Sequence, residues 1–142
     1  MSECIFCKIG KKEIPAEVVG EDARTLAFLD IHPKAPGHTV IIPKAHCETL
    51  IDLPEEEMRP LFAMAKRLDE ILVRALRADG MTIGINQGKA AGQAVPHFHL
   101  HLMPRFAGDG GSSVHGIVLN PPRETIAEIA AQIRKVAGIN QP

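Results

Sequence analysis

The sequence predicts an α+β domain, a mostly antiparallel sheet with one long helix and one C-terminal helix packed on it. Three observations predict this fold. Short apolar runs bounded by Gly, Pro, Asp or Asn recur along the chain, which is typical of strands joined by turns. Apolar residues repeat every three or four positions between residues 52 and 79, which indicates one amphipathic helix. Histidines alternate with apolar residues over 97–103, the two-residue period of a strand.

The predicted strands are short, and most of them lie on the N-terminal side of the long helix. Each is a run of apolar or β-branched residues that stops at a turn-forming residue. The two-residue alternation is clearest in the last of them. The runs comprise residues 16–20, 25–29, 39–43, 81–86 and 98–104.

The long helix carries one apolar stripe, and charged residues suit both of its ends. Glutamates at 55–57 favour a helix start, and Arg74 and Arg77 favour its last turn, with Gly80 expected at the C′ position. Pro60 lies too deep for a helix that starts at residue 54, so either a separate first turn precedes it or the helix bends there. The stripe consists of Met58, Leu61, Ala65, Leu68, Leu72 and Ala75.

The C-terminal part of the chain is predicted to add a Gly-rich loop at 107–113 and a second helix at about 123–136. No internal repeat or linker composition divides the sequence. We therefore expect residues 1–142 to form a single domain, with its core in residues 4–106 and the C-terminal loop and helix in 107–142.

Composition excludes several functional classes. The chain has 142 residues and a formal net charge of −1, and its Lys and Arg residues are scattered, so we expect no nucleic-acid surface. No apolar run approaches the roughly 20 residues that span a bilayer, and no export signal is recognisable, so we expect no membrane association. Three cysteines, an odd number, indicate reduced thiols and hence a cytoplasmic protein.

The alternating histidines are the candidate reactive groups. On a strand, His97, His99 and His101 line one exposed face while Phe98 and its apolar neighbours enter the core. Same-face Cα atoms are about 6.6 Å apart on a strand, so the outer histidines are too distant to bind one zinc ion together with the middle one. The middle histidine, His99, is therefore the better reactive centre, and a merely solvated histidine face is the alternative.

An imidazole nitrogen is a competent nucleophile toward phosphorus. It needs one nitrogen unprotonated, the other N–H held by an acceptor, and donors around the phosphoryl oxygens. The loop at 86–96 offers such donors, because Asn86 and Gln93 carry amides and Gly92 permits a close backbone approach. A Gly-containing loop of this kind is also an ordinary turn.

The histidine strand and the loop before it together match the pattern of a known family. The stretch Gly92-Gln93-(x)3-His97-x-His99-x-His101, followed by two apolar residues, resembles the signature of the histidine triad family of nucleotide hydrolases and transferases. The stretches at 37–46 and 27–31 are similar to two earlier strands of that family. The resemblance runs from about Cys4 to Arg105. It implies the fold described above, a hydrolase acting at the α-phosphate of a purine nucleotide without a catalytic metal, and a homodimer whose sheet continues across the interface.

The resemblance also implies a role for each matching position. His99 is expected to be the nucleophile, with His101 and His38 flanking the phosphate and His97 completing the catalytic set. The substrate-binding set is Asp30 for the ribose hydroxyls, Leu29 and Ile31 near the base, and Asn86, Gly92 and Gln93 at the phosphate or leaving group. Ala94 departs from the pattern, since many members carry Ser or Thr there, and a lost hydroxyl donor costs on the order of 1–3 kcal/mol.

A metal site is indicated by Cys4 and Cys7, which form a C-x2-C pair. No second pair exists, and free thiols are the alternative. Bacterial members of the family resemble this arrangement, which implies a structural zinc bound by Cys4, Cys7, His46 and His97. A zinc-bound His97 is no longer free as a general acid, and it would instead orient the strand that presents His99. Cys47 is expected to be a small, semi-buried residue.

Three functions remain to be separated. The first is hydrolysis of nucleotide phosphoramidates or dinucleoside polyphosphates through a covalent nucleotidyl-His99, which releases a nucleoside monophosphate. The second is a purine-nucleotide-binding regulatory module with little turnover, which Ala94 favours. The third is a metalloenzyme that binds a catalytic ion on the histidine strand, which the strand spacing and the lack of nearby carboxylates disfavour.

Overall fold

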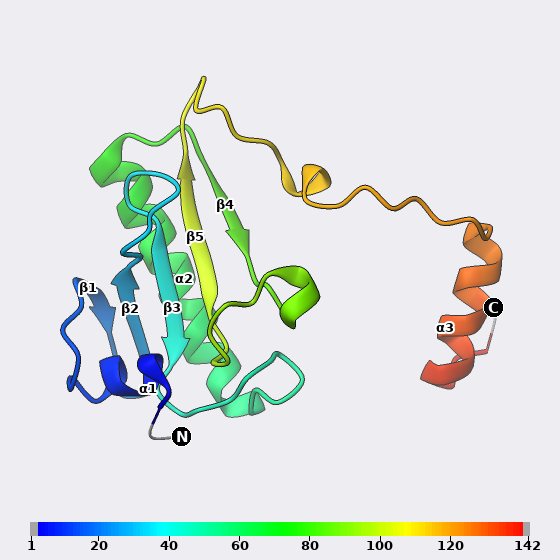
Figure 1. Ribbon diagram of the computed structural model, residues 1–142, viewed down its shortest axis with the longest axis horizontal. Coiled ribbons are helices and arrows are strands. Elements are labelled where there is room, and N and C mark those ends of the chain that lie inside the picture. Colours follow the sequence, from blue (N-terminus) through cyan, green and yellow to red (C-terminus); the bar gives the residue numbers. More distant parts are fainter. Residues whose placement is uncertain (1–2, 141–142) are drawn as a thin grey trace. The chain divides into compact units, whose positions relative to one another are not determined.

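A computed structural model describes residues 3–140, which fall into two compact units divided between Gly111 and Ser112. The first unit contains a five-stranded antiparallel sheet with strand order β1-β2-β3-β5-β4 (Figure 1). Its helices are α1 (Ile5–Gly10) and α2 (Glu55–Leu76), and a 3-10 turn, η1 (Lys89–Ala91), precedes the last strand. The strands are β1 (Val18–Glu21), β2 (Thr25–Leu29), β3 (Thr39–Pro43), β4 (Gly80–Gly84) and β5 (Leu100–Arg105). The α+β class and antiparallel sheet are thus confirmed.

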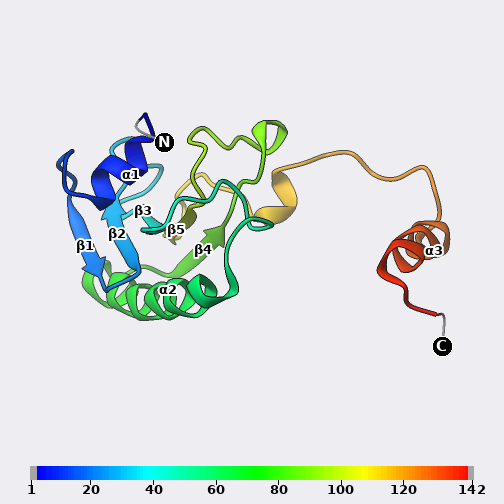
Figure 2. The same cartoon turned by 90° about the horizontal axis from the view of Figure 1, so that it is seen from below.

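Helices α1 and α2 lie on opposite faces of the sheet (Figure 2). On one face, α2 packs against Ala27, Ile41, Phe98, Leu100 and Leu102, all of which are buried. On the other face, Ile9 and Phe6 of α1 pack with Leu26, Phe28, Val40 and Ile42. Because residues alternate along β5, His101 points to the face that carries α1. The histidines and the N-terminal cysteines therefore share one face.

The long helix forms as predicted, with different ends. It begins after Pro54 and runs through Pro60 without interruption. It ends at Leu76 and is capped by Arg77, whose backbone is left-handed (φ 56°) and whose N–H donates to the oxygen of Val73. The prediction that Gly80 occupies the C′ position is therefore wrong, because Arg77 closes the helix and Gly80 already begins β4.

The strand that carries the histidines, predicted over 98–104, begins later than predicted. Strand β5 begins at Leu100, so His97 and His99 lie in the irregular segment before it. The expectation of one exposed histidine face is also wrong. His97 and His99 are buried, at 0% and 7% exposure, because the α1 turn covers them, whereas His101 is partly exposed. Phe98, Leu100 and Leu102 enter the core as predicted.

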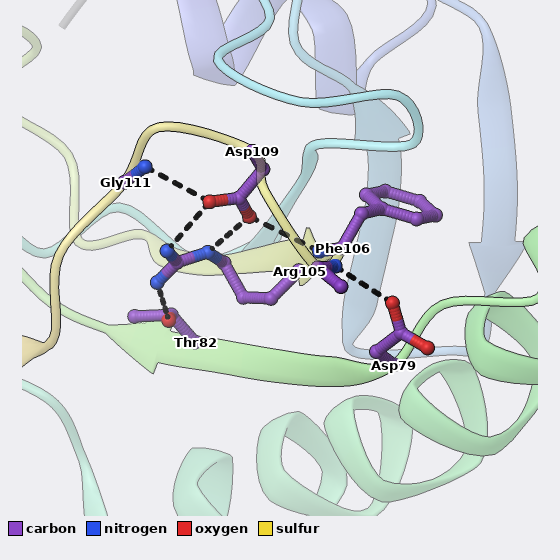
Figure 3. A network of polar contacts seen from close by, with 7 residues as sticks. Asp79, Thr82, Arg105, Phe106, Asp109 and Gly111 are labelled. Carbon is purple, nitrogen blue, oxygen red and sulfur yellow. Dashed lines mark hydrogen bonds and ion pairs between the residues drawn. The ribbon is translucent and has the colours of Figure 1, made fainter.

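The Gly-rich loop after β5 is organised by Asp109 (Figure 3). Both carboxylate oxygens accept from the Arg105 guanidinium, at 2.7 and 3.0 Å, and they also accept the backbone N–H groups of Phe106 and Gly111. Arg105 in turn donates to the Thr82 hydroxyl on β4. These contacts tie the end of β5 to the edge strand and lower the pKa of Asp109, chiefly through Arg105.

The second unit contains η2 (Val114–Gly116) and α3 (Ile126–Ala137). Helix α3 starts with a capping box, in which Thr125 and Glu128 exchange side-chain and backbone hydrogen bonds, and it ends at the left-handed Gly138. It matches the predicted C-terminal helix, and none of its residues is buried. Its packing on the sheet, and a single domain over 1–142, stay predictions. Among residues 3–140, no helix is both long and apolar enough to cross a bilayer.

Candidate active site and metal centre

The site is built around His99, whose ring orientation is fixed by the backbone. Its Nδ1 atom lies 2.7 Å from the carbonyl oxygen of His97. A carbonyl only accepts, so Nδ1 carries the proton and the Nε2 atom of a neutral ring keeps its lone pair. This is the state that a nucleophilic imidazole requires.

A second pair of histidines lies beside it. His38 Nδ1 accepts the backbone N–H of Lys34 at 3.1 Å, so the proton of a neutral His38 is on Nε2. That atom lies 2.8 Å from His101 Nδ1 and donates to it. His101 therefore carries its own proton on Nε2, and its ring packs edge-to-face on His99 with centroids 4.9 Å apart. The two residues form a directed relay that ends in an N–H donor next to the nucleophile.

Burial keeps this relay neutral. It lowers the pKa of His101 to about 4, with smaller contributions from His99 and His38. It also lowers the pKa of His38, against the opposing effect of Asp30, whose carboxylate oxygen is 3.7 Å from His38 Nε2. Near neutral pH both rings are therefore uncharged, as the hydrogen-bond directions require.

Asp30 lies at the edge of this site. Its backbone N–H donates to His38 O at 2.9 Å, and one carboxylate oxygen accepts the N–H of His32 at 2.8 Å. The side chain is only partly buried. Leu29 and Asp30 line a surface hollow with His38 and the 33–37 turn, whereas Ile31 is 82% exposed outside it. The structure thus brings Asp30, Leu29 and His38 together.

The predicted phosphate loop has a different internal organisation. The Gln93 amide braces the loop, because its oxygen accepts from Gly88 N–H at 2.8 Å and its nitrogen donates to the carbonyls of Glu48 and Val95. Gly92 has φ +88° and caps η1. Asn86 is exposed. Contact of Asn86, Gly92 and Gln93 with a phosphate stays a prediction.

Four predicted zinc ligands converge on the same face of the sheet. The His97 Nδ1 atom lies 3.4 Å from Cys4 Sγ, 3.5 Å from Cys7 Sγ and 3.3 Å from His46 Nδ1. Cys7 Sγ lies 3.3 Å from His46 Nδ1. Zinc bonds of about 2.0–2.1 Å to nitrogen and 2.3 Å to sulfur give tetrahedral edges of roughly 3.3 Å and 3.5 Å. The observed distances match those edges.

The protonation of His97 supports the same reading. Its Nε2 atom lies 2.8 Å from the Pro43 carbonyl oxygen and donates to it, which leaves the Nδ1 lone pair directed at the cysteines and His46. Burial lowers the pKa of His97 to about 4, so the ring is neutral. Cys7 N–H also points to Cys4 Sγ at 3.4 Å. The donor set therefore fits a closed structural zinc site, and a zinc-bound His97 would have no nitrogen left for acid–base chemistry.

A second cluster, Asp30, His38 and His101, is also compact enough to hold a metal ion. The hydrogen bonds argue against one. A metal would need the His38 Nε2 lone pair, while Nδ1 already uses its lone pair to accept from Lys34 N–H. The ring would have to be an imidazolate anion, so the cluster is better described as a hydrogen-bonded relay.

These observations agree with the comparisons to known proteins. The model of the HIT domain matches residues 11–108. The chain belongs to the HIT family. An uncharacterized HIT-like protein of Methanocaldococcus jannaschii is 46% identical over 117 residues, which cover 82% of this chain and 90% of the relative.

Two further HIT relatives bear on function. Adenosine 5′-monophosphoramidase HNT1 of Saccharomyces cerevisiae is 45% identical over 102 residues, which cover 72% of this chain and 62% of the relative. The crystal structure of a zinc-bound histidine triad family protein from Mycobacterium smegmatis matches with a TM-score of 0.74 and 38% identity, covering 95% of this chain and 98% of that one. The HIT fold of this chain is thus shared with solved structures.

Sequence reasoning missed three contributors to this HIT site. Phe6 contacts the rings of both His97 and His99, and its position inside the Cys4–Cys7 pair was the available signal. The backbone N–H of Lys34 and the carbonyl of Pro43 set the protonated nitrogens of His38 and His97. Backbone groups carry no residue-specific signal, so only the structure identifies them.

Proposed function

We propose that this HIT protein hydrolyses nucleotide phosphoramidates or dinucleoside polyphosphates at the α-phosphate, through a nucleotidyl-His99 intermediate, and releases a nucleoside monophosphate. The observation that carries the proposal is the His99 Nδ1 to His97 O contact of 2.7 Å. It leaves Nε2 of His99 unprotonated, and the His38–His101 relay presents an N–H donor beside it. Similarity to a yeast phosphoramidase supports the substrate class.

The reaction has two displacements at phosphorus. In the first, His99 Nε2 forms a bond to the α-phosphorus while the bond from phosphorus to the leaving group breaks. The leaving group takes up one proton from solvent, while the Nε2–H of the neutral His101 donates a hydrogen bond to a phosphoryl or leaving-group atom and keeps its proton. In the second, water attacks phosphorus, the P–Nε2 bond breaks, and the water loses one proton to solvent. The sum is substrate plus water giving nucleoside monophosphate plus the protonated leaving group.

Substrate binding is assigned to residues around this centre. Asp30 accepts hydrogen bonds from the ribose hydroxyls, because its carboxylate is partly exposed beside His38. Leu29 and Ile31 contact a purine base next to it. Asn86, Gly92 and Gln93 contact the phosphate or leaving group, which requires the Gln93 amide to exchange a loop hydrogen bond for a substrate one.

We further propose that Cys4, Cys7, His46 and His97 bind a structural zinc ion. Zinc there would supply no chemistry in the displacement; it would hold the N-terminal turn against the sheet. The matching donor distances and the zinc-bound relative support this assignment. The proposal also includes a cytoplasmic homodimer that binds neither nucleic acid nor membrane, as the resemblance and the composition favour.

The test is AMP release from adenosine 5′-phosphoramidate and from diadenosine tetraphosphate, with and without EDTA in the assay. The wild type is compared with His99→Ala and with His32→Ala, a control that removes an exposed histidine near the site. We expect turnover in the wild type and the control, none in His99→Ala, and an acid-quenched wild-type adduct heavier by one AMP moiety. Turnover in His99→Ala would overturn the proposal, and nucleotide binding without turnover would establish the binding module instead.

A further inference from the structure

We propose that the Cys4–Cys7 turn positions the catalytic histidine, so that metal binding at this turn holds His99 in its Nδ1-protonated form. The turn acts through the ring of Phe6 and through the backbone of His97. The inference rests on the proposed function in taking His99 as the nucleophile. It assigns to Phe6 and His97 the role of positioning residues.

The first route is the ring of Phe6, which α1 carries between the two cysteines. Its centroid lies 5.2 Å from that of His99 at 85° and 5.9 Å from that of His97 at 74°. It also packs edge-on against Phe28 of β2, at 5.5 Å. Edge-to-face contacts of this kind are directional and favourable. The Phe6 ring therefore restrains the His99 ring on the α1 side of the sheet, opposite the side chains of Phe98 and Leu100.

The second route is the backbone of His97. Its two ring nitrogens are directed at fixed partners, Nε2 at the Pro43 carbonyl and Nδ1 at the cluster of thiols and His46. Its carbonyl oxygen accepts the Nδ1–H of His99. One residue thus connects the metal cluster to the group that determines which nitrogen of the nucleophile is free.

Regular secondary structure gives the two routes little support. The segment 97–99 precedes β5, so no strand ladder holds it, and the Phe98 N–H instead donates to the carbonyl of Cys47, next to His46. Helix α1 has only six residues, and Ile9 is the buried one among them. A helix this short is unstable without tertiary anchors. Packing of Phe6 and Ile9 on the sheet is one such anchor, and the four-ligand cluster is a second one that joins Cys4, Cys7 and His46 to His97.

The test reads the tautomer of His99 by 15N NMR of its ring at pH 8, where an ordinary histidine is neutral. Samples are the zinc-loaded protein, the zinc-stripped protein and the stripped protein after zinc is restored. We expect a single Nδ1–H form with zinc, a mixture of both tautomers without it, and recovery on restoration. Backbone signals of Ala27 and Ile41, in the buried centre of the sheet, report whether the stripped protein stays folded.

The second measurement uses the zinc-loaded variant Phe6→Leu. It tests the positioning of His99 even if removal of zinc unfolds the chain. We expect it to keep zinc, to show mixed tautomers at His99, and to lose about tenfold in kcat with KM changed less. Phe6→Tyr should restore the wild-type tautomer, and Phe62→Leu, at an exposed phenylalanine of α2, should change nothing.

A single Nδ1–H tautomer in both the folded stripped protein and Phe6→Leu would overturn the inference. Because the NMR signal needs no substrate, the two proposals fail separately. A zinc-dependent tautomer without AMP formation would leave the positioning role intact and reject the hydrolase.

Discussion

The Nε2 atom of His38 lies 2.8 Å from the Nδ1 atom of His101, although the two residues are 63 positions apart in the chain. The pairing of β3 with β5 brings them together, since Val40 is opposite His101 and His38 directly precedes β3. The N–H of Lys34 orients His38, and His38 orients His101. The donor next to His99 is therefore determined by a backbone N–H of the 33–37 turn.

Removing His38 should impair catalysis more than binding. His38→Ala leaves the Nδ1 atom of His101 without its donor, so His101 no longer has a fixed protonated nitrogen. We expect kcat to fall roughly 10- to 100-fold with a smaller change in KM. His38→Gln, whose amide N–H is able to donate to His101, should recover part of the loss. Steady-state AMP release measures both, and a wild-type kcat in His38→Ala would contradict the relay.

His101 should make the protein less stable in acid. Burial lowers its pKa to about 4, against an ordinary value of 6.5, so the unfolded chain binds more protons between these pH values. The free energy of unfolding therefore decreases as pH falls from about 6.5 to 4, by at most about 3 kcal/mol. Urea unfolding from pH 7.5 to 4.5 should show this slope, and His101→Asn should reduce it. Identical slopes in the two proteins would exclude His101 as the source.

Gly37 should resist substitution because of its backbone. Its φ of +79° lies in the left-handed region, and a Cβ there would overlap the side chain of Leu76. We expect Gly37→Ala to lose about 1–3 kcal/mol of stability and to displace His38, which follows it, with a lower kcat. Gly80→Ala is the matched control, because no atom lies within 4 Å of its Cβ position. Equal unfolding midpoints in both variants would refute the prediction.

Local sequence patterns predicted the elements whose residues alternate or repeat strongly. The strands at 25–29 and 39–43 have the predicted bounds, because their buried β-branched and apolar residues end at turn-forming neighbours. The end of α2 was not predictable from the sequence, because Arg77 adopts a left-handed conformation that is usual for glycine or asparagine at a helix end. The start of β5 was missed because the irregular segment 97–99 keeps the alternation of a strand without its pairing.

At the site, the sequence predicted which residues come together better than it predicted how their side chains are hydrogen-bonded. The four candidate zinc ligands lie together as predicted, although Cys4 and His97 are 93 positions apart. By contrast, the protonated nitrogens of His38, His97 and His99 depend on backbone groups that lie next to them only after folding. The role of Gln93 as a brace follows from the turn at 88–93, which no side-chain pattern specified.

Ala94 provides the last prediction, which concerns the leaving group. It is exposed, it directly follows Gln93, and it occupies a position where the histidine triad pattern often has a hydroxyl. A hydroxyl that bonds the phosphate or leaving group only in the transition state is worth on the order of 1–3 kcal/mol, so Ala94→Ser should raise kcat roughly 5- to 160-fold. KM should change less, because the gain is specific to the transition state.

The measurement compares AMP release from adenosine 5′-phosphoramidate and diadenosine tetraphosphate in Ala94→Ser and in Ala90→Ser, which adds a hydroxyl at an exposed position of η1. A gain in Ala94→Ser alone, larger for one leaving group, would place residue 94 at the leaving-group side. Unchanged rates in both variants would show that this chain needs no hydroxyl there, so that the relay from His38 through His101 supplies the donor by itself.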